Sequence, residues 1–166
     1  MEGRLGLSME PQVQVESVPR TATAKAQFEH PVALVYNGYG DRLLTLPTVR
    51  ALANLWLGRL TLIGETGDDE LFYADVPLRR FVGLSFHRDP LEQSGGWLFD
   101  YSAVVSSLHR ADSLFLPFTW TSTSIARLVQ SFSSAKTYGF SASLPSRLLY
   151  PRNLHAADAT FRLASS

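Results

Sequence analysis

The stretch LVYNGYGDRLLTLPTVRAL, residues 34–52, contains the residue types and spacing in this 166-residue chain that best suit chemistry. Gly38 and Gly40 follow an apolar run, and Asp41 comes directly after them. Glycines in such a place permit positive φ and a close approach of the backbone to a ligand. A carboxylate at the mouth of a cleft can act as a general base and accept a proton from an attacking hydroxyl. Asp41 can also cap the helix that follows and interact with its dipole, and the two roles are compatible.

The spacing of this stretch excludes the common nucleotide-binding loops. G-Y-G-D-R-L begins like the dinucleotide fingerprint G-x-G-x-x-G, but Leu43 stands where the third glycine belongs. Asp41 would repel a pyrophosphate held at the helix N-terminus. The lysine and hydroxyl of a P-loop are absent from the stretch as well. We therefore expect no nicotinamide, flavin or P-loop nucleotide site here.

Three further side chains are candidates for substrate binding. His109 and Arg110 follow a segment typical of a strand, so we expect them at the carboxyl edge of the sheet, where they could orient acceptor hydroxyls or a phosphate. Trp120 lies beside a cluster of hydroxyl residues, and its ring could stack on a sugar. The alternatives are a solvated loop pair and an ordinary core or domain-interface tryptophan. No group of residues has the spacing of a complete metal site, so we expect no metal.

Segments typical of strands and helices alternate around these candidates. Short apolar runs predict strands at 31–36, 59–65, 79–86, 100–108 and 135–140, and helix-like patterns cover 41–56, 67–75, 121–132 and 154–165, with a loop at 87–97. Pro47 predicts a first turn that ends near Leu46 and a main helix that starts at the proline. The leucine and tryptophan positions of 43–56 have helical spacing and are expected in the core. This order predicts an α/β domain with a mostly parallel sheet and right-handed crossovers.

Composition limits the class of protein. The chain is 45% hydrophobic and 18% charged, its formal net charge is zero, and it has no cysteine. These values indicate one ordinary domain and give no reason to expect binding to nucleic acid or anionic lipid. No apolar run approaches the ~20 residues of a membrane span, and the N-terminus lacks the apolar segment of a signal peptide, so a cytoplasmic protein is expected. Residues 1–30 are polar and predict a flexible arm before a single domain at 31–166.

The stretch GYGDRLLTLPTVRAL resembles the signature of glycosyltransferase family 9, the bacterial heptosyltransferases, in which a glycine–aspartate step, a leucine-rich turn, a proline and an R-A-L helix follow the first strand. Further segments are similar in order and spacing: RLTLIGE, FDYSAVVSSLHRADS, AKTYGFS and LHAADATFRLAS. The first segment is fairly specific, whereas the others are persuasive only together. The resemblance covers roughly residues 31–165.

This resemblance implies a Rossmann-like three-layer domain equivalent to the N-terminal, acceptor-binding half of a GT-B enzyme. In that family a second domain binds the nucleotide-sugar donor, no metal is needed, and transfer inverts the anomeric carbon. Asp41 matches the proposed catalytic base, and residues Asn37, Gly38, Tyr39 and Gly40 would border the sugar or small-molecule acceptor. The last helix would lead into the interdomain linker, so a donor domain would have to come from elsewhere, for instance a protein partner. The half alone is expected to be inactive.

One departure from the family pattern bears on the acceptor. Where many members have a lysine or a serine pair just before the glycine–aspartate step, this chain has Tyr36, Asn37 and Tyr39. A more aromatic and less cationic pocket favours a neutral or aromatic acceptor, such as a natural-product scaffold. The alternative function is a non-catalytic module that binds a small molecule or a partner on the same scaffold. A flavodoxin-like regulatory domain is less favoured, because the acids Asp68, Asp69 and Glu70 follow the second predicted strand rather than the first.

Overall fold

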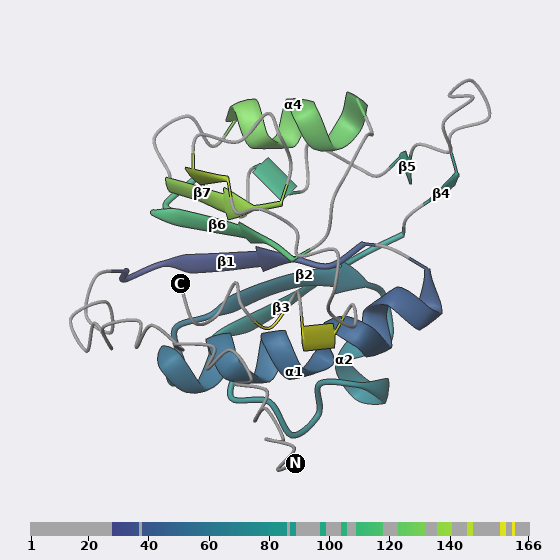
Figure 1. Ribbon diagram of the computed structural model, residues 1–166, viewed down its shortest axis with the longest axis vertical. Coiled ribbons are helices and arrows are strands. Elements are labelled where there is room, and N and C mark those ends of the chain that lie inside the picture. Colours follow the sequence, from purple (N-terminus) through teal and green to yellow (C-terminus); the bar gives the residue numbers. More distant parts are fainter. Residues whose placement is uncertain are drawn as a thin grey trace, which may run out of the picture.

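The computed structural model describes residues 28–36, 38–85, 87–88, 97–98, 104–105, 109–117, 123–131, 136–140, 146–147, 157–158 and 161. Its elements are β1 (Pro31–Leu34), α1 (Tyr39–Leu55), β2 (Thr61–Glu65), α2 (Asp68–Leu71), β3 (Arg80–Leu84), β4 (His87–Arg88), β5 (Trp97–Leu98), β6 (Ser113–Leu116), α4 (Thr123–Ser131), β7 (Lys136–Gly139) and β8 (Ser146–Arg147). Six of these strands form one sheet in the order β3-β2-β1-β6-β7-β8, and every pairing in it is parallel. Figure 1 shows α1 on one face of this sheet and α4 on the other. The predicted Rossmann-like α/β fold with a mostly parallel sheet is confirmed.

The strand order places a topological switch between β1 and β6. The chain builds outward from β1 to β3 and then returns to add β6 on the other side of β1. In open sheets of this kind, ligands bind beyond the carboxyl ends of the strands at the switch. We call the edge where the strands end the carboxyl edge and the edge where they begin the amino edge. Asp41 lies in the first turn of α1, just past the end of β1, and therefore at the carboxyl edge.

Each face of the sheet has its own hydrophobic cluster. Along β1, Ala33 belongs to the cluster under α1, whereas Val32 and Leu34 belong to the cluster on the α4 face. All four residues of β1 are buried, as expected for a central parallel strand covered on both faces. The helix contributes Val49, Leu52 and Trp56 to its cluster, which confirms most of the predicted apolar stripe. Leu43 is the exception, because its side chain is 45% exposed.

Pro47 does not divide the helix, contrary to the prediction. Helix α1 runs without a break from Tyr39 to Leu55 with the proline inside it. Proline lacks an N–H, so the Leu43 carbonyl loses its partner four residues on. Both Leu43 and Pro47 are exposed, and water can therefore solvate that carbonyl.

The predicted strand at 100–108 is also wrong where the structure describes it, because Val104 and Val105 are helical. On the side of β1 away from β2, the neighbouring strand is β6, which begins at Ser113. In the predicted loop 87–97, His87–Arg88 pairs antiparallel with Trp97–Leu98. The remaining residues of that loop lie outside the described part of the chain.

Phe28 marks the start of the described domain. Its ring is 7% exposed and makes edge contacts with Trp56, Phe115 and Tyr138, at centroid distances of 5.9, 6.2 and 5.9 Å. The side chain of Asp112 accepts hydrogen bonds from the backbone N–H groups of Glu29 and His30, at 2.6 and 3.0 Å. The last three residues of the predicted arm 1–30 thus pack on the domain. The first 27 lie outside the described residues.

Candidate functional site at the carboxyl edge

The turn between β1 and α1 positions Asp41. Gly38 is the N-cap of α1, with φ of −57° and ψ of 163°, and its carbonyl accepts the Arg42 N–H at 3.1 Å. Among the described residues only Gly58 and Gly67 have positive φ, so neither Gly38 nor Gly40 uses the positive φ that glycine permits. A Cβ added to Gly38 would lie 4.0 Å from Asp41 Oδ2, which is ordinary van der Waals contact. The turn therefore places the carboxylate close to the Gly38 backbone.

The Asp41 carboxylate is exposed and makes no hydrogen bond or ion pair with any described residue. The N-cap of α1 makes no side-chain hydrogen bond, so the interpretation of Asp41 as a side-chain cap is wrong. Its place in the first turn still suits the positive end of the helix dipole. An accessible carboxylate without a protein partner can accept a proton from the hydroxyl of a bound ligand.

The next residue, Arg42, forms the main ion pair at this edge. Its Nη1 donates to both carboxylate oxygens of Asp68, at 2.9 and 3.0 Å, and the two side chains are only 13% and 5% exposed. Burial raises the pKa of Asp68, and the charge and hydrogen bonds of Arg42 oppose that shift. Asp68 begins α2, which follows β2, so the pair connects the first turns of two helices after neighbouring strands. The sequence analysis did not predict this pair. The pattern that could have indicated it is a basic residue after the first strand and an acidic residue after the second, each at the start of a helix.

The aromatic residues of the stretch divide between core and surface. Tyr36 is 5% exposed and belongs to the cluster on the α4 face, so its assignment to an acceptor pocket is wrong. Burial raises the pKa of its hydroxyl above the ordinary value. Tyr39 is 54% exposed, contacts Phe72 edge-on at 5.2 Å, and lies under the Arg42 guanidinium at 5.8 Å. Of these two tyrosines, Tyr39 is therefore the one that a ligand beside Asp41 could reach.

Not all of the predicted site residues lie at this edge. His109 and Arg110 precede β6 rather than follow a strand, and they line a hollow with residues from the starts of β1, β2 and β3. Their expected position at the carboxyl edge is wrong, and the structure does not bring them to Asp41. Asn37 and Trp120 lie outside the described residues. Gly38, Tyr39, Gly40 and Asp41 do lie together in one turn.

Within the described part of the chain, no group of three or more histidine and acidic side chains is placed to hold a metal ion. The same residues contain no helix long and apolar enough to cross a membrane.

Comparison with solved structures decides the fold. The chain superposes on a family 9 glycosyl transferase from Veillonella parvula with a TM-score of 0.62 and 14% identity, over 81% of this chain and 40% of that one. It also superposes on the E. coli heptosyltransferase WaaC with ADP, with a TM-score of 0.54 and 15% identity, over 81% and 46% of the two chains. The fold is that of one half of a GT-B glycosyltransferase. No family model and no curated protein sequence matches the chain significantly.

The stretch GYGDRLLTLPTVRAL predicted a likeness to family 9, and the solved structures confirm this likeness at the level of the GT-B-type fold. The 166 residues span less than half the length of the chains they match. Identities of 14–15% establish the shared architecture.

Proposed function

We propose that this chain is the acceptor-binding half of an inverting, metal-independent glycosyltransferase in which Asp41 is the general base. The observation that carries the proposal is the Asp41 carboxylate, which is exposed, bonds to no described residue and lies just beyond β1, at the switch in strand order. The GT-B-type fold supports it, because such enzymes bind their substrates between two halves. The matched WaaC structure holds ADP, so a nucleotide-sugar is the donor we propose.

The proposed reaction follows from the position of the carboxylate. Asp41 takes the proton of an acceptor hydroxyl as that oxygen attacks the anomeric carbon of the donor sugar. The bond from that carbon to the phosphate oxygen breaks, the nucleoside diphosphate leaves with the electron pair, and the carbon inverts. A donor-binding half must hold the sugar opposite Asp41, because the attack needs reacting atoms in near-attack geometry.

The surroundings of Asp41 favour a neutral acceptor. Arg42, the basic residue of the same turn, is bound to Asp68 and is only 13% exposed. The exposed Tyr39 ring offers an apolar face and edge for a sugar or an aromatic scaffold. A natural-product acceptor without phosphate groups agrees with this distribution better than a phosphorylated one.

The test combines the purified chain with donor-binding halves taken from the two matched enzymes, with ADP-sugar donors and a panel of neutral acceptors. Transfer is measured as ADP release and as mass added to the acceptor. Asp41→Asn keeps the size of the side chain but cannot take the proton, so the rate should fall by roughly 10²–10⁴-fold. Acceptor affinity, measured by calorimetry, should change by no more than a few-fold.

Asp75→Asn is the matched control, since Asp75 is also exposed and pairs with Arg50 away from the turn. It should transfer sugar at the wild-type rate. A reconstituted activity that survives Asp41→Asn intact would show that this carboxylate is not the base.

The second candidate function is a non-catalytic binding module on the same scaffold. It is favoured by the hollow at the amino edge, which lies away from Asp41 and would bind a ligand without any transfer chemistry. A chain that binds a ligand there, but neither binds an acceptor nor supports transfer with any donor half, would favour the module over the transferase.

A further inference from the structure

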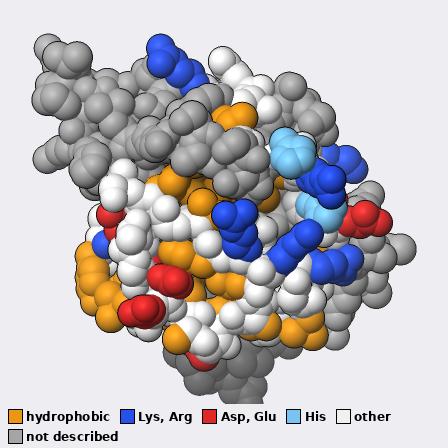
Figure 2. All heavy atoms as spheres, turned by 180° about the vertical axis from the view of Figure 1, so that it is seen from behind, with side chains coloured by type: hydrophobic (Ala, Val, Ile, Leu, Met, Phe, Trp, Pro, Cys, Tyr) orange, Lys and Arg blue, Asp and Glu red, His pale blue; other side chains and the backbone are white. Residues whose placement is uncertain are grey.

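A hollow of about 150 Å³ opens at the amino edge of the sheet, the end opposite Asp41. We call it the amino-edge hollow and define it by its lining: His30, Val32, Thr61, Arg79, Arg80, His109, Arg110 and Ala111. The lining includes three arginines and two histidines and no acidic residue. In the view of Figure 2, Lys, Arg and His side chains gather on one side of the molecule.

Strand register explains the floor of the hollow. Val32 pairs with Thr61, and Thr61 pairs with Arg80, so one row of the parallel sheet contains all three residues. Residues in such a row project to the same face. Val32 belongs to the cluster on the α4 face, so the hollow opens on that face. Val32 and Thr61 are buried and form its base, whereas Arg80 is exposed at its side.

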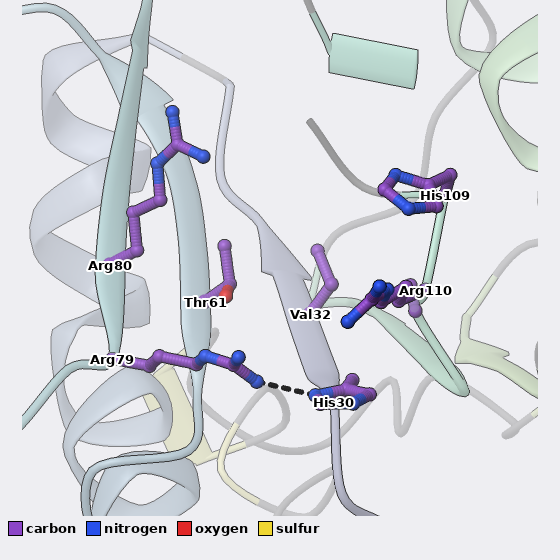
Figure 3. A pocket seen from close by; sticks show the side chains of 8 residues that line it. His30, Val32, Thr61, Arg79, Arg80, His109 and Arg110 are labelled. Atoms are coloured by element: carbon purple, nitrogen blue, oxygen red, sulfur yellow. Dashed lines mark hydrogen bonds between the residues drawn. The ribbon is translucent and has the colours of Figure 1, made fainter. Parts of the chain in front are cut away.

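The remaining walls come from segments distant in sequence. The side chain of Arg79 reaches across to His30, and Nη1 bonds to His30 Nδ1 (Figure 3). A guanidinium can only donate, so His30 Nδ1 is the acceptor of this bond. His109 and Arg110 approach from the turn before β6, on the other side of Val32 (Figure 3). The Asp112 carboxylate holds the backbone of this turn beside His30.

The charge in the hollow is not neutralised by described side chains. Neither Arg80 nor Arg110 makes a hydrogen bond or ion pair with any described residue, and the Thr61 hydroxyl has no hydrogen-bond partner among them either. The nearest acids along the chain, Glu29 and Asp112, are not part of the lining. Asp112 is also occupied, since it accepts bonds from two backbone N–H groups and from the Ser113 hydroxyl at 3.2 Å.

We propose that the amino-edge hollow binds a small phosphorylated anion, with Arg80, Arg110 and Thr61 as its main donors. Guanidinium forks match the oxygens of a phosphoryl group in pairs, and the bonds are strengthened by charge. The buried hydroxyl at the base adds a neutral donor. A diphosphate suits the hollow better than a carboxylate, because it presents more acceptors and more negative charge to the basic side chains on its two sides.

The test is calorimetry of the whole chain with pyrophosphate, inorganic phosphate and acetate at low ionic strength, repeated with added salt. Pyrophosphate should bind most tightly and acetate should not bind measurably. Arg80→Ala and Arg110→Ala should each weaken pyrophosphate binding about tenfold, and Arg110→Lys should recover part of the loss. Since neither side chain bonds to a described residue, the melting temperatures of these variants should equal that of the wild type.

Arg50→Ala is the charge-matched control, because Arg50 lies on α1 outside the hollow, and it should change binding less than twofold. Asp41→Asn should leave binding unaltered, which separates this proposal from the transferase proposal. The inference is overturned if millimolar pyrophosphate does not bind, or if Arg50→Ala weakens binding as much as Arg80→Ala does.

Discussion

The Arg42–Asp68 pair gives the sharpest test of how the carboxyl edge is built. We consider Arg42→Met, which keeps an unbranched side chain of similar length but removes the charge. The carboxylate left behind is 5% exposed and would lose both of its bonds to Nη1. At a separation of about 4 Å and an effective dielectric constant near 20, the lost attraction is about 4 kcal/mol. Removing one partner of a buried pair costs 3–5 kcal/mol in measured cases. Because Arg42 keeps some exposure, we expect about 3 kcal/mol at pH 7.

The same helix supplies the control. Arg50 donates from Nη2 to both oxygens of Asp75 at 3.1 Å, the same chemistry as Arg42 with Asp68. The two side chains are 46% and 68% exposed, however, and exposed pairs contribute roughly 0–1 kcal/mol. Arg50→Met should therefore cost less than 1 kcal/mol in the free energy of unfolding. Because the two ion pairs have the same chemistry, the difference between the two variants measures the effect of burial.

The pH dependence separates the ion pair from lost side-chain contacts. Burial raises the pKa of Asp68 in the folded state, and Arg42 now limits that rise. In Arg42→Met the folded pKa rises further, so over a wider range of pH the folded state holds a proton that the unfolded chain releases. The unfolding free energy of the variant should then increase relative to the wild type as the pH falls from 7 to 4.5. The cost of the substitution should shrink accordingly.

Urea unfolding of the wild type and both variants at pH 7 and 4.5 measures these differences. The reasoning is refuted if Arg42→Met costs as much at pH 4.5 as at pH 7. It also fails if Arg50→Met is as destabilising as Arg42→Met, because burial would then not decide the energy.

Three further predictions concern glycines, and all are checked by the same unfolding measurements. Gly64→Ala should destabilise the fold by about 1–3 kcal/mol, because the new Cβ would lie 3.0 Å from two ring carbons of Phe81 within the buried strand β2. Gly40→Ala should stabilise by up to about 1 kcal/mol, because the position is helical and nothing lies within 4 Å of the added atom. Gly58→Ala meets no atoms either, but its φ of 68° makes it cost about 1–2 kcal/mol, so a gain there would contradict the backbone argument.

The sequence predicted the layers of this fold because its central strands are buried on both faces. A strand such as β1 appears in the sequence as a continuous apolar run, and its helix follows with a 3.6-residue period. The fourth strand was misplaced for the same reason. Residues 104–105 have the β-branched composition of a strand yet are helical, whereas β6 is a run of only four residues ended by Pro117. When two short apolar segments are close in sequence, their composition does not show which of them forms a strand of the sheet.

At the candidate site, the sequence predicted the position of Asp41 but not its surroundings. A glycine pair and an acid after the first apolar run place that acid at the carboxyl edge through chain connectivity alone. The Arg42–Asp68 pair depends instead on two strands lying side by side, and the burial of Tyr36 depends on which face of the sheet it meets. The misplaced strand carried His109 and Arg110 to the wrong edge. Because the strand was predicted before these two residues and lies after them, they were expected at the opposite edge of the sheet.

The two edges of the sheet differ in which of their charged side chains are paired and which are exposed, and this difference bears on both proposals. At the carboxyl edge the cation is internal, because Arg42 is bound to Asp68, whereas Asp41, Asp69 and Glu70 are exposed. At the amino edge Asp112 bonds to backbone N–H groups, Arg80 and Arg110 are exposed, and the exposed Glu29 lies outside the lining of the hollow. The Asp41 carboxylate bonds to no described cation, and the Arg80 and Arg110 guanidinium groups bond to no described acid, so each is available to a ligand. Among the described residues, the two edges of the sheet therefore carry opposite charge although the formal net charge of the chain is zero, and each edge suits a different ligand.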